Sequence, residues 1–214
     1  MPPSSALKCA VLKSSSRPAW LLPLIVIALV LPVVMLTSRL PGDPEVARFI
    51  QRLGIPAWPA AAITSLVTRP ALYALIAVGV LLATWRGRLR GLVTAVVLIA
   101  AWWYAGEPLK EVVHRPRPTA EFVEVVRPSS GFSFPSTFAT TWFSVWLPVA
   151  IYAFRTRQRS AGLAVCSAAW VAILLGGWAR VRMGAHWPSD ILMTFGLVWA
   201  TFSLIDMTVA RLEE

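Results

Sequence analysis

Six apolar stretches dominate this chain and restrict it to a membrane fold. As a helix, each stretch is long enough to cross the hydrocarbon core of a bilayer, which is about 30 Å thick. Hydrophobic residues make up 57% of the 214 residues, and the mean hydropathy of +0.66 is too high for an ordinary soluble domain. The chain is therefore predicted to be an all-α integral membrane bundle of six transmembrane helices. The six stretches lie at about residues 20–38, 62–85, 89–106, 136–154, 160–178 and 188–208.

The segments outside these stretches define the expected organisation. Residues 1–19 are predicted to be a basic cytoplasmic tail, residues 20–208 the six-helix membrane domain and residues 209–214 a cytoplasmic C-terminus. Segment 43–58 mixes charged and apolar side chains, which indicates an interfacial helix or a short lid. Residues 107–135 carry too many charges to face lipid, so they are expected to form a water-facing cap between the third and fourth spans.

The distribution of basic residues predicts which way the chain crosses the membrane. A net charge of +10 would suggest nucleic acid for a soluble protein, but membrane proteins collect Lys and Arg in cytoplasmic loops. With six spans, ten cations fall on each face, and only one face has basic turns without acidic residues. We therefore predict a multi-pass protein of the inner (plasma) membrane with both termini in the cytoplasm, an outward-facing site and no nucleic-acid partner. The cations of the cytoplasmic face are Lys8, Lys13, Arg17, Arg86, Arg88, Arg90, Arg155, Arg157, Arg159 and Arg211.

Polar residues at the outer ends of the later spans are suited to binding a phosphate group. Lys110 is a compact cation, whereas Arg117 and Arg180 offer planar guanidinium groups for bidentate contacts. Ser136 follows a proline at the expected start of the fourth span, where its hydroxyl and the free backbone N–H groups of a helix end suit a phosphate oxygen. A dense anion in a partly dry site needs these fixed charges and donors.

His186 and Asp190 add a nucleophile to this anion site. They are four residues apart, so they share one face if a helix continues through Pro188. If Pro188 instead begins the last span, Asp190 can still reach back to the ring from the first turn. In both cases Asp190 is expected to accept one ring N–H and to leave the other nitrogen free to attack phosphorus.

Together these motifs resemble the type 2 phosphatidic acid phosphatase family of membrane lipid phosphate phosphatases. The shared pattern is Lys-x6-Arg-Pro at residues 110–118, Pro-Ser at 135–136 and Arg-x5-His-x3-Asp at 180–190. The resemblance implies a six-helix enzyme without a metal or other cofactor, acting on a lipid phosphate or diphosphate in the bilayer. It implies that His186 is phosphorylated and then releases phosphate to water, assisted by Asp190. The phosphoryl oxygens would be held by Lys110, Arg117, Ser136, Thr137 and Arg180.

Phe138 departs from the family pattern at the position of the general acid. The middle motif of the family usually reads Pro-Ser-Gly-His, and here Thr137 and Phe138 follow Ser136. A benzyl group cannot protonate a leaving oxygen, and losing general acid catalysis typically costs about 10²–10⁴ in rate. We therefore expect activity to be impaired, least so for a diphosphate, whose leaving phosphate is less basic than an alkoxide. His114, the other histidine, is a weaker candidate for the acid. Ala179, where the family often has Ser, removes one further donor.

Three other functions remain open from the sequence. Phe138 fits an inactivated copy of an active phosphatase, which we favour, but it also fits a lipid-phosphate binding or transport protein that keeps the anion site without turnover. A phosphotransferase would pass the same phosphohistidine to another lipid instead of to water. Vanadium-dependent haloperoxidases share the motifs, but they are soluble, whereas this chain is predicted to be a membrane protein. This third function is therefore disfavoured. The lipid substrate is left open among isoprenyl diphosphates such as undecaprenyl diphosphate, phosphatidylglycerophosphate, phosphatidic acid and lipid A phosphates.

Overall fold

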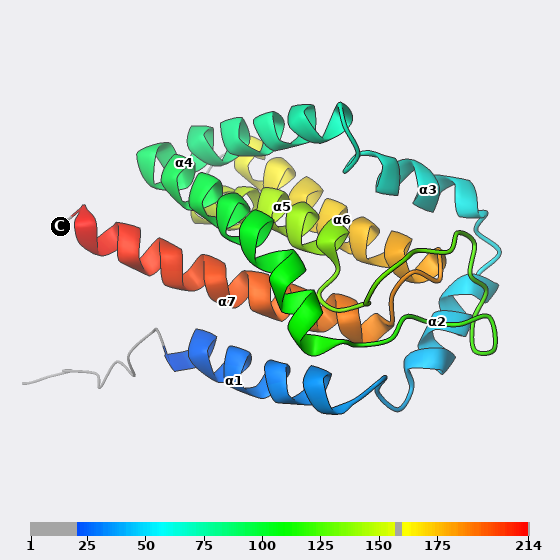
Figure 1. The fold of residues 1–214 in the computed structure, drawn as a ribbon. Helices are drawn as coiled ribbons and strands as arrows, with labels where there is room; N and C mark the ends of the chain where they lie inside the picture. The colour runs from blue at the N-terminus through cyan, green and yellow to red at the C-terminus, as the bar shows by residue number, and fades with distance from the viewer. Residues whose placement is uncertain (1–20, 157–159, 214) are drawn as a thin grey trace, which may run out of the picture.

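The computed structural model describes residues 21–156 and 160–213, and every regular element within them is a helix. The predicted cytoplasmic tail at 1–19 lies outside the described residues. So do five of the ten cations used for the orientation: Lys8, Lys13 and Arg17 in the tail, and Arg157 and Arg159 in the turn after the fourth span. Figure 1 shows the helices running side by side in one bundle. The elements are α1 (Leu21–Leu36), α2 (Asp43–Arg52), α3 (Ala57–Ser65), α4 (Ala71–Val113), α5 (Thr137–Arg155), α6 (Ser160–Arg182) and α7 (Pro188–Leu212).

Four of the described helices are long and apolar enough to cross a membrane: α4, α5, α6 and α7. Helix α1 is apolar but has only 16 residues. Helix α5 is the most buried of the four, and it packs against α4, α6 and α7 in the middle of the bundle. The expected all-α membrane architecture is thus present, and the chain is a multi-pass membrane protein.

Helix α4 contains two arms that fold back on each other (Figure 1). Arg88 interrupts the helical backbone with φ 55° and ψ −141°, between arms at about residues 71–87 and 89–113. The arms approach closely at Gly91, where an added Cβ would lie 2.1 Å from the Ala83 carbonyl oxygen. A glycine is therefore required beside the reversal. The two arms correspond to the second and third predicted spans.

The boundaries of these two spans differ from the prediction. The first arm begins at Ala71 and not at residue 62, because α3 ends at Ser65 and a turn leads to Pro70, which precedes the helix. The second arm continues to Val113, so residues 107–113 belong to the helix and not to the predicted cap. This arm ends at His114, which adopts a left-handed conformation with φ 54°. Lys110 is consequently fixed on a helix.

The segment between α4 and α5 folds over the end of the bundle. Its backbone pairs with the turn after α6 through Val126 N–H and the Met183 carbonyl, 3.1 Å apart. The Gln51 side chain of α2 binds both backbone groups of Glu124, at 2.7 and 3.0 Å. Segment 43–58, predicted to be an interfacial helix or lid, contains α2 and the start of α3, and α2 packs on α6 and α7.

An ionic cluster around the buried Asp206 joins three helices at the other end of the bundle. The Asp206 carboxylate of α7 accepts hydrogen bonds from Arg90 at 2.7 Å, from Arg155 at 2.8 Å and from the Tyr152 hydroxyl at 2.6 Å. Asp206 follows Asp190 by 16 residues on the same helix, which places the two carboxylates about 24 Å apart along its axis. This cluster ties α4, α5 and α7 together far from the candidate site.

Candidate active site

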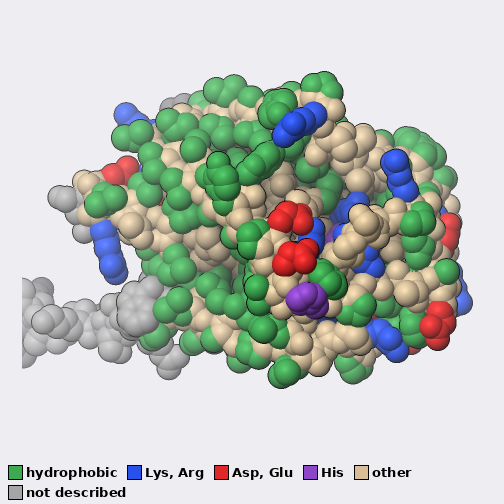
Figure 2. Space-filling model, viewed as in Figure 1, with side chains coloured by type: hydrophobic (Ala, Val, Ile, Leu, Met, Phe, Trp, Pro, Cys, Tyr) green, Lys and Arg blue, Asp and Glu red, His purple; other side chains and the backbone are tan. Residues whose placement is uncertain are grey.

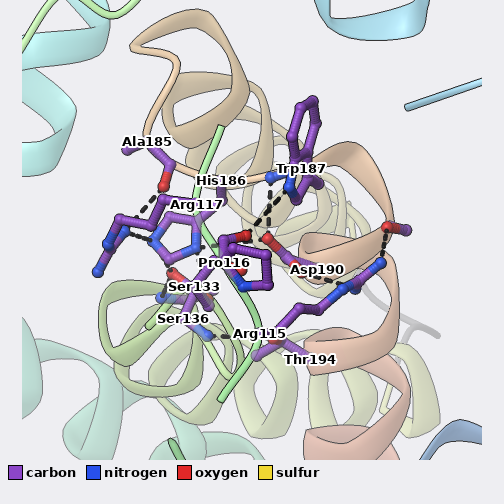
Figure 3. Close-up of polar contacts among 12 residues, drawn as sticks. Arg115, Pro116, Arg117, Ser133, Ser136, Ala185, His186, Trp187, Asp190 and Thr194 are labelled. Atoms are coloured by element: carbon purple, nitrogen blue, oxygen red, sulfur yellow. Dashed lines mark hydrogen bonds and ion pairs between the residues drawn. The ribbon is translucent and has the colours of Figure 1, made fainter. Parts of the chain in front are cut away.

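His186 lies at the centre of a buried polar cluster where the C-terminal ends of α4 and α6 meet the N-terminal ends of α5 and α7 (Figure 3). It belongs to the short turn between α6 and α7, and only 2% of the residue is exposed. Its Nδ1 lies 2.7 Å from the Ser133 carbonyl oxygen. Because a carbonyl can only accept, this contact assigns the ring proton to Nδ1 and leaves a lone pair on Nε2. The Ser133 carbonyl thereby fixes the orientation of the ring and leaves Nε2 unprotonated.

Two donors face the Nε2 atom of His186. Arg117 Nη1 and Ser136 Oγ each lie 3.2 Å from it. Ser136 is the N-cap of α5 and also accepts the Ala139 N–H at 3.3 Å, which fixes its hydroxyl at the helix end. Arg117 is held by three carbonyl oxygens, those of Ser130, Gly131 and Ala185. The predicted nucleophile and two predicted phosphate ligands are therefore brought together.

Asp190 does not accept the ring proton of His186, contrary to the expectation from the sequence. Its Oδ2 lies 3.9 Å from Nδ1 and instead accepts the Trp187 backbone N–H at 2.9 Å. The reason is that Pro188 begins α7, which puts Asp190 in the first turn, where a carboxylate caps the free N–H groups. Asp190 is nevertheless next to the ring, and the Ser133 carbonyl accepts the hydrogen bond from Nδ1–H in its place.

Arg115 holds the other oxygen of Asp190. Arg115 Nη1 lies 2.7 Å from Asp190 Oδ1, and Nη2 lies 3.0 Å from the Ser189 hydroxyl. Arg115 is 1% exposed and Asp190 is fully buried, so this ion pair is removed from water. A basic residue near the end of a span is often a lipid-facing anchor. Arg115 instead supports the turn that carries His186 from inside the bundle.

Lys110 and Thr137 form a second group beside the cluster, joined by Glu107. Lys110 Nζ lies 2.8 Å from Glu107 Oε1 and also contacts Thr137 Oγ1. The Thr137 hydroxyl donates to the same Glu107 oxygen at 2.7 Å. Glu107 was not predicted as a site residue, although its position three residues before Lys110 on a helix is the spacing of an ion pair. Figure 2 shows acidic, basic and histidine side chains gathered around a hollow at this end of the bundle.

Arg180 completes the set of cations and contacts Phe138. Its guanidinium carbon lies 5.3 Å from the centre of the Phe138 ring, within the range of a cation–π contact. The Nε atom of Arg180 is buried and has no hydrogen-bond partner within the described part of the chain. Phe138 is buried in the first turn of α5 and stacks on Trp142, with ring centres 5.5 Å apart. Position 138 therefore borders the cluster.

His114 is placed differently from the other histidine. It is exposed at the end of α4, its ring packs edge-on against Phe132 at 4.4 Å, and its Nδ1 lies 3.4 Å from the Val112 carbonyl. No hydrogen bond or ion pair of the described residues joins it to the cluster around His186. The position of His114 therefore gives no support to its role as the alternative general acid.

Burial and positive charge keep the His186 ring neutral. Removal from water is the largest cause of a His186 pKa well below the ordinary value of 6.5, and the charges of Arg180, Arg117 and Lys110 act in the same direction. The Ser133 carbonyl opposes this shift only in part. Burial also lowers the pKa of Arg117. A neutral imidazole surrounded by cations is suited to attack an anionic phosphorus centre, since the nitrogen lone pair stays available.

The fold and the cluster define a helical membrane protein with a buried histidine beside basic and hydroxyl side chains. The chain belongs to the PAP2 superfamily, whose family model matches residues 91–211. This match confirms the resemblance drawn from the motifs. None of the curated proteins compared with the chain matches it.

A solved structure has the same fold. It is described as the first transmembrane PAP2 type phosphatidylglycerolphosphate phosphatase from Bacillus subtilis, and it is 20% identical in sequence with a TM-score of 0.66. The alignment covers 89% of this chain and 96% of that one. The similarity therefore extends beyond the family-matched region to most of the helical bundle.

Proposed function

We propose that this protein removes phosphate from a lipid phosphate or diphosphate through a phosphohistidine at His186. The observation that carries the proposal is the position of Nε2, which faces Arg117 and Ser136 at 3.2 Å while Nδ1 donates to the Ser133 carbonyl. An uncharged nucleophile and two fixed donors meet at one point. Membership of the PAP2 superfamily adds support.

The first chemical step follows from this arrangement. The Nε2 lone pair forms a bond to phosphorus, and the bond to the leaving oxygen breaks with its electron pair. Arg117, Arg180 and Lys110 supply positive charge to the phosphoryl oxygens, and Ser136 donates a hydrogen bond. Thr137 and the free backbone N–H groups at the start of α5 add donors. Water then attacks the phosphohistidine and releases phosphate.

Phe138 restricts the substrates that this site can turn over. The Phe138 side chain cannot protonate the leaving oxygen, so substrates with a weakly basic leaving group are favoured. A diphosphate releases a phosphate ester that needs little protonation, whereas a monophosphate releases an alkoxide. We therefore place lipid diphosphates, including isoprenyl diphosphates, ahead of phosphatidylglycerophosphate, phosphatidic acid and lipid A phosphates.

The proposed membrane arrangement has six crossings. Helix α1, the two arms of α4, and α5 to α7 would each cross once, with the His186 cluster on the outer face of the inner membrane and both termini in the cytoplasm. The basic residues near the reversal of α4 and at the end of α5 support this orientation, since positive residues collect on the cytoplasmic side. The segment between α4 and α5 would then cap the site from outside.

The experiment is phosphate release from a panel of lipid phosphates and diphosphates, by the purified chain and by its Phe138→His form. We expect slow release from diphosphates by the chain and faster release from both classes by Phe138→His. Binding of these lipids with no release by either form would contradict the proposal and favour a binding or transport protein. Labelled phosphate appearing on a second lipid would instead indicate phosphotransfer.

A further inference from the structure

Asp43 of α2 is a buried carboxylate on the far side of the ion pair between Arg115 and Asp190. It is 4% exposed and lies 147 residues before Asp190, outside the family-matched region. Its Oδ2 lies 3.7 Å from Arg115 Nη2. Arg115 therefore sits between two carboxylates, one from each end of the chain.

All the contacts of the Asp43 carboxylate come from donors. Oδ1 accepts the Ser189 backbone N–H at 2.8 Å, and Oδ2 accepts the Ser189 hydroxyl at 2.6 Å and the Leu40 backbone N–H at 2.7 Å. This is the pattern of an ionised carboxylate, which can only accept. Ser189 also accepts from Arg115, so one continuous network joins Asp43, Ser189, Arg115 and Asp190.

The charge of this network matters to His186. Arg115 offsets much of the attraction that Asp190 alone would exert on a positive charge at the neighbouring imidazole. Asp43 gives the three charged groups a net charge of −1. Because the cluster is buried, these charges are weakly screened, and Asp190, the carboxylate next to the ring, lies 3.9 Å from His186 Nδ1.

Such a charge is needed during phosphoryl transfer. When Nε2 bonds to phosphorus, the ring keeps its Nδ1 proton and becomes positively charged, while the leaving oxygen takes the electron pair. The Ser133 carbonyl receives the Nδ1–H but carries no full charge. The positive charges of Arg180, Arg117 and Lys110 disfavour a positive imidazole.

We propose that Asp43 is a positioning residue of this site, which supplies the net negative charge that stabilises the His186 imidazolium through Arg115 and Asp190. This inference rests on the proposed function. It assigns to α2, a helix outside the family-matched region, a part in the chemistry beyond its packing on α6 and α7.

Orthovanadate provides a test that does not depend on turnover. It adopts the five-coordinate geometry of phosphoryl transfer, so it reports stabilisation of the transition state, whereas inorganic phosphate reports binding of the ground state. Asp43→Asn keeps the size of the side chain and removes its charge. We expect this change to weaken vanadate binding by roughly 10- to 100-fold. This is the range by which loss of a carboxylate behind a metal-ligating histidine weakens metal binding. Phosphate binding should change far less, and in active preparations kcat should fall more than KM rises.

Glu45→Gln is the matched control. Glu45 lies two residues along the same helix turn and is exposed, and among the described residues its carboxylate pairs with Arg48. Its loss should change vanadate binding by no more than about twofold. Asp43→Glu keeps the charge and gives a second variant if Asp43→Asn does not fold; we expect it to retain the preference for vanadate over phosphate.

The outcomes separate this inference from the proposed function. If the unmodified chain binds vanadate no better than phosphate, the proposed function is wrong and the role of Asp43 falls with it. If the unmodified chain prefers vanadate and folded Asp43→Asn keeps that preference, the role of Asp43 is wrong while the proposed function stands. Loss of the preference in folded Asp43→Glu would also overturn the inference, because the charge is retained.

Discussion

The guanidinium of Arg180 lies over the ring of Phe138, with 5.3 Å between the guanidinium carbon and the ring centre. Trp142 stacks on the ring within the same helix. A cation–π contact stabilises a cation by about 0.5–2 kcal/mol, whereas a protonated histidine at this position would repel Arg180. Phe138 is thus compatible with the neighbouring cation but, unlike a histidine, cannot donate a proton.

Replacing Phe138 by His should restore general acid catalysis. Phosphate release from lipid monophosphates should rise by about 10²–10⁴, and release from diphosphates should rise less because their leaving group needs less help. Initial rates for one monophosphate and one diphosphate in mixed micelles measure this difference. Phe138→Asn introduces polarity without a titratable proton and serves as the control. An equal gain in both variants would mean that proton transfer is not the cause.

The neutral state of His186 predicts a pH dependence of stability. The His186 pKa is lowered in the folded protein, so the unfolded chain binds more protons when the pH falls below about 6.5. The contribution of this residue to folding is therefore present above that pH and is lost as the pH falls toward the folded pKa. The difference in unfolding free energy between the unmodified chain and His186→Gln should shrink from pH 7.5 to pH 5. A constant difference over this range would contradict a lowered pKa, and His114→Gln provides the control for an exposed imidazole.

Gly184 should be intolerant of a side chain. Its φ of +65° is unfavourable for other residues, and an added Cβ would lie 2.1 Å from the Glu124 carbonyl oxygen. Gly54 has a similar φ of +72° with no atom within 4 Å of such a Cβ. Gly54→Ala should therefore cost about 1–2 kcal/mol from the backbone alone, and Gly184→Ala should cost more. Thermal unfolding in detergent measures both, and equal losses would show that the Glu124 contact yields easily.

The Asp206 cluster should affect stability without affecting chemistry. Asp206→Asn leaves Arg90, Arg155 and Tyr152 with a neutral partner, and the loss of charged hydrogen bonds should cost about 2–3 kcal/mol. Because the cluster lies about 24 Å along α7 from Asp190, activity per folded molecule should stay the same. The melting temperature and the rate per folded molecule test the two statements separately. A large drop in the rate would reveal coupling between the two ends of the bundle.

Much of the helical arrangement could be predicted from hydrophobic periodicity and length. The start of α5 at Thr137, of α6 at Ser160 and of α7 at Pro188 fall within one residue of the expected spans. The start of α4 was misplaced, because the turn at residues 66–70 contains a single charged residue, Arg69, and hydropathy averaged over the whole stretch does not register the break. Its end was also misplaced, because Glu107 and Lys110 pair on the helix surface and so allow charged residues to remain helical.

Part of the spatial arrangement of the candidate site could be predicted from side-chain chemistry. Arg117, Ser136 and His186 lie together as the motifs indicate. The hydrogen-bond acceptor for the ring N–H is the backbone carbonyl of Ser133, and a backbone group cannot be identified from the residue type. Asp43 was missed for a different reason. It lies far from the motifs in sequence, and only the fold brings it to Arg115.

Trapping the covalent intermediate tests the central claim most directly. The Phe138→His form should be mixed with a lipid phosphate labelled at its terminal phosphoryl group, quenched within milliseconds under alkaline conditions that preserve phosphohistidine, and digested for mass spectrometry. We predict one acid-labile phosphoryl group on the peptide that contains His186, and none in a His186→Ala variant. Label on another residue, or full phosphate release by His186→Ala, would contradict the account.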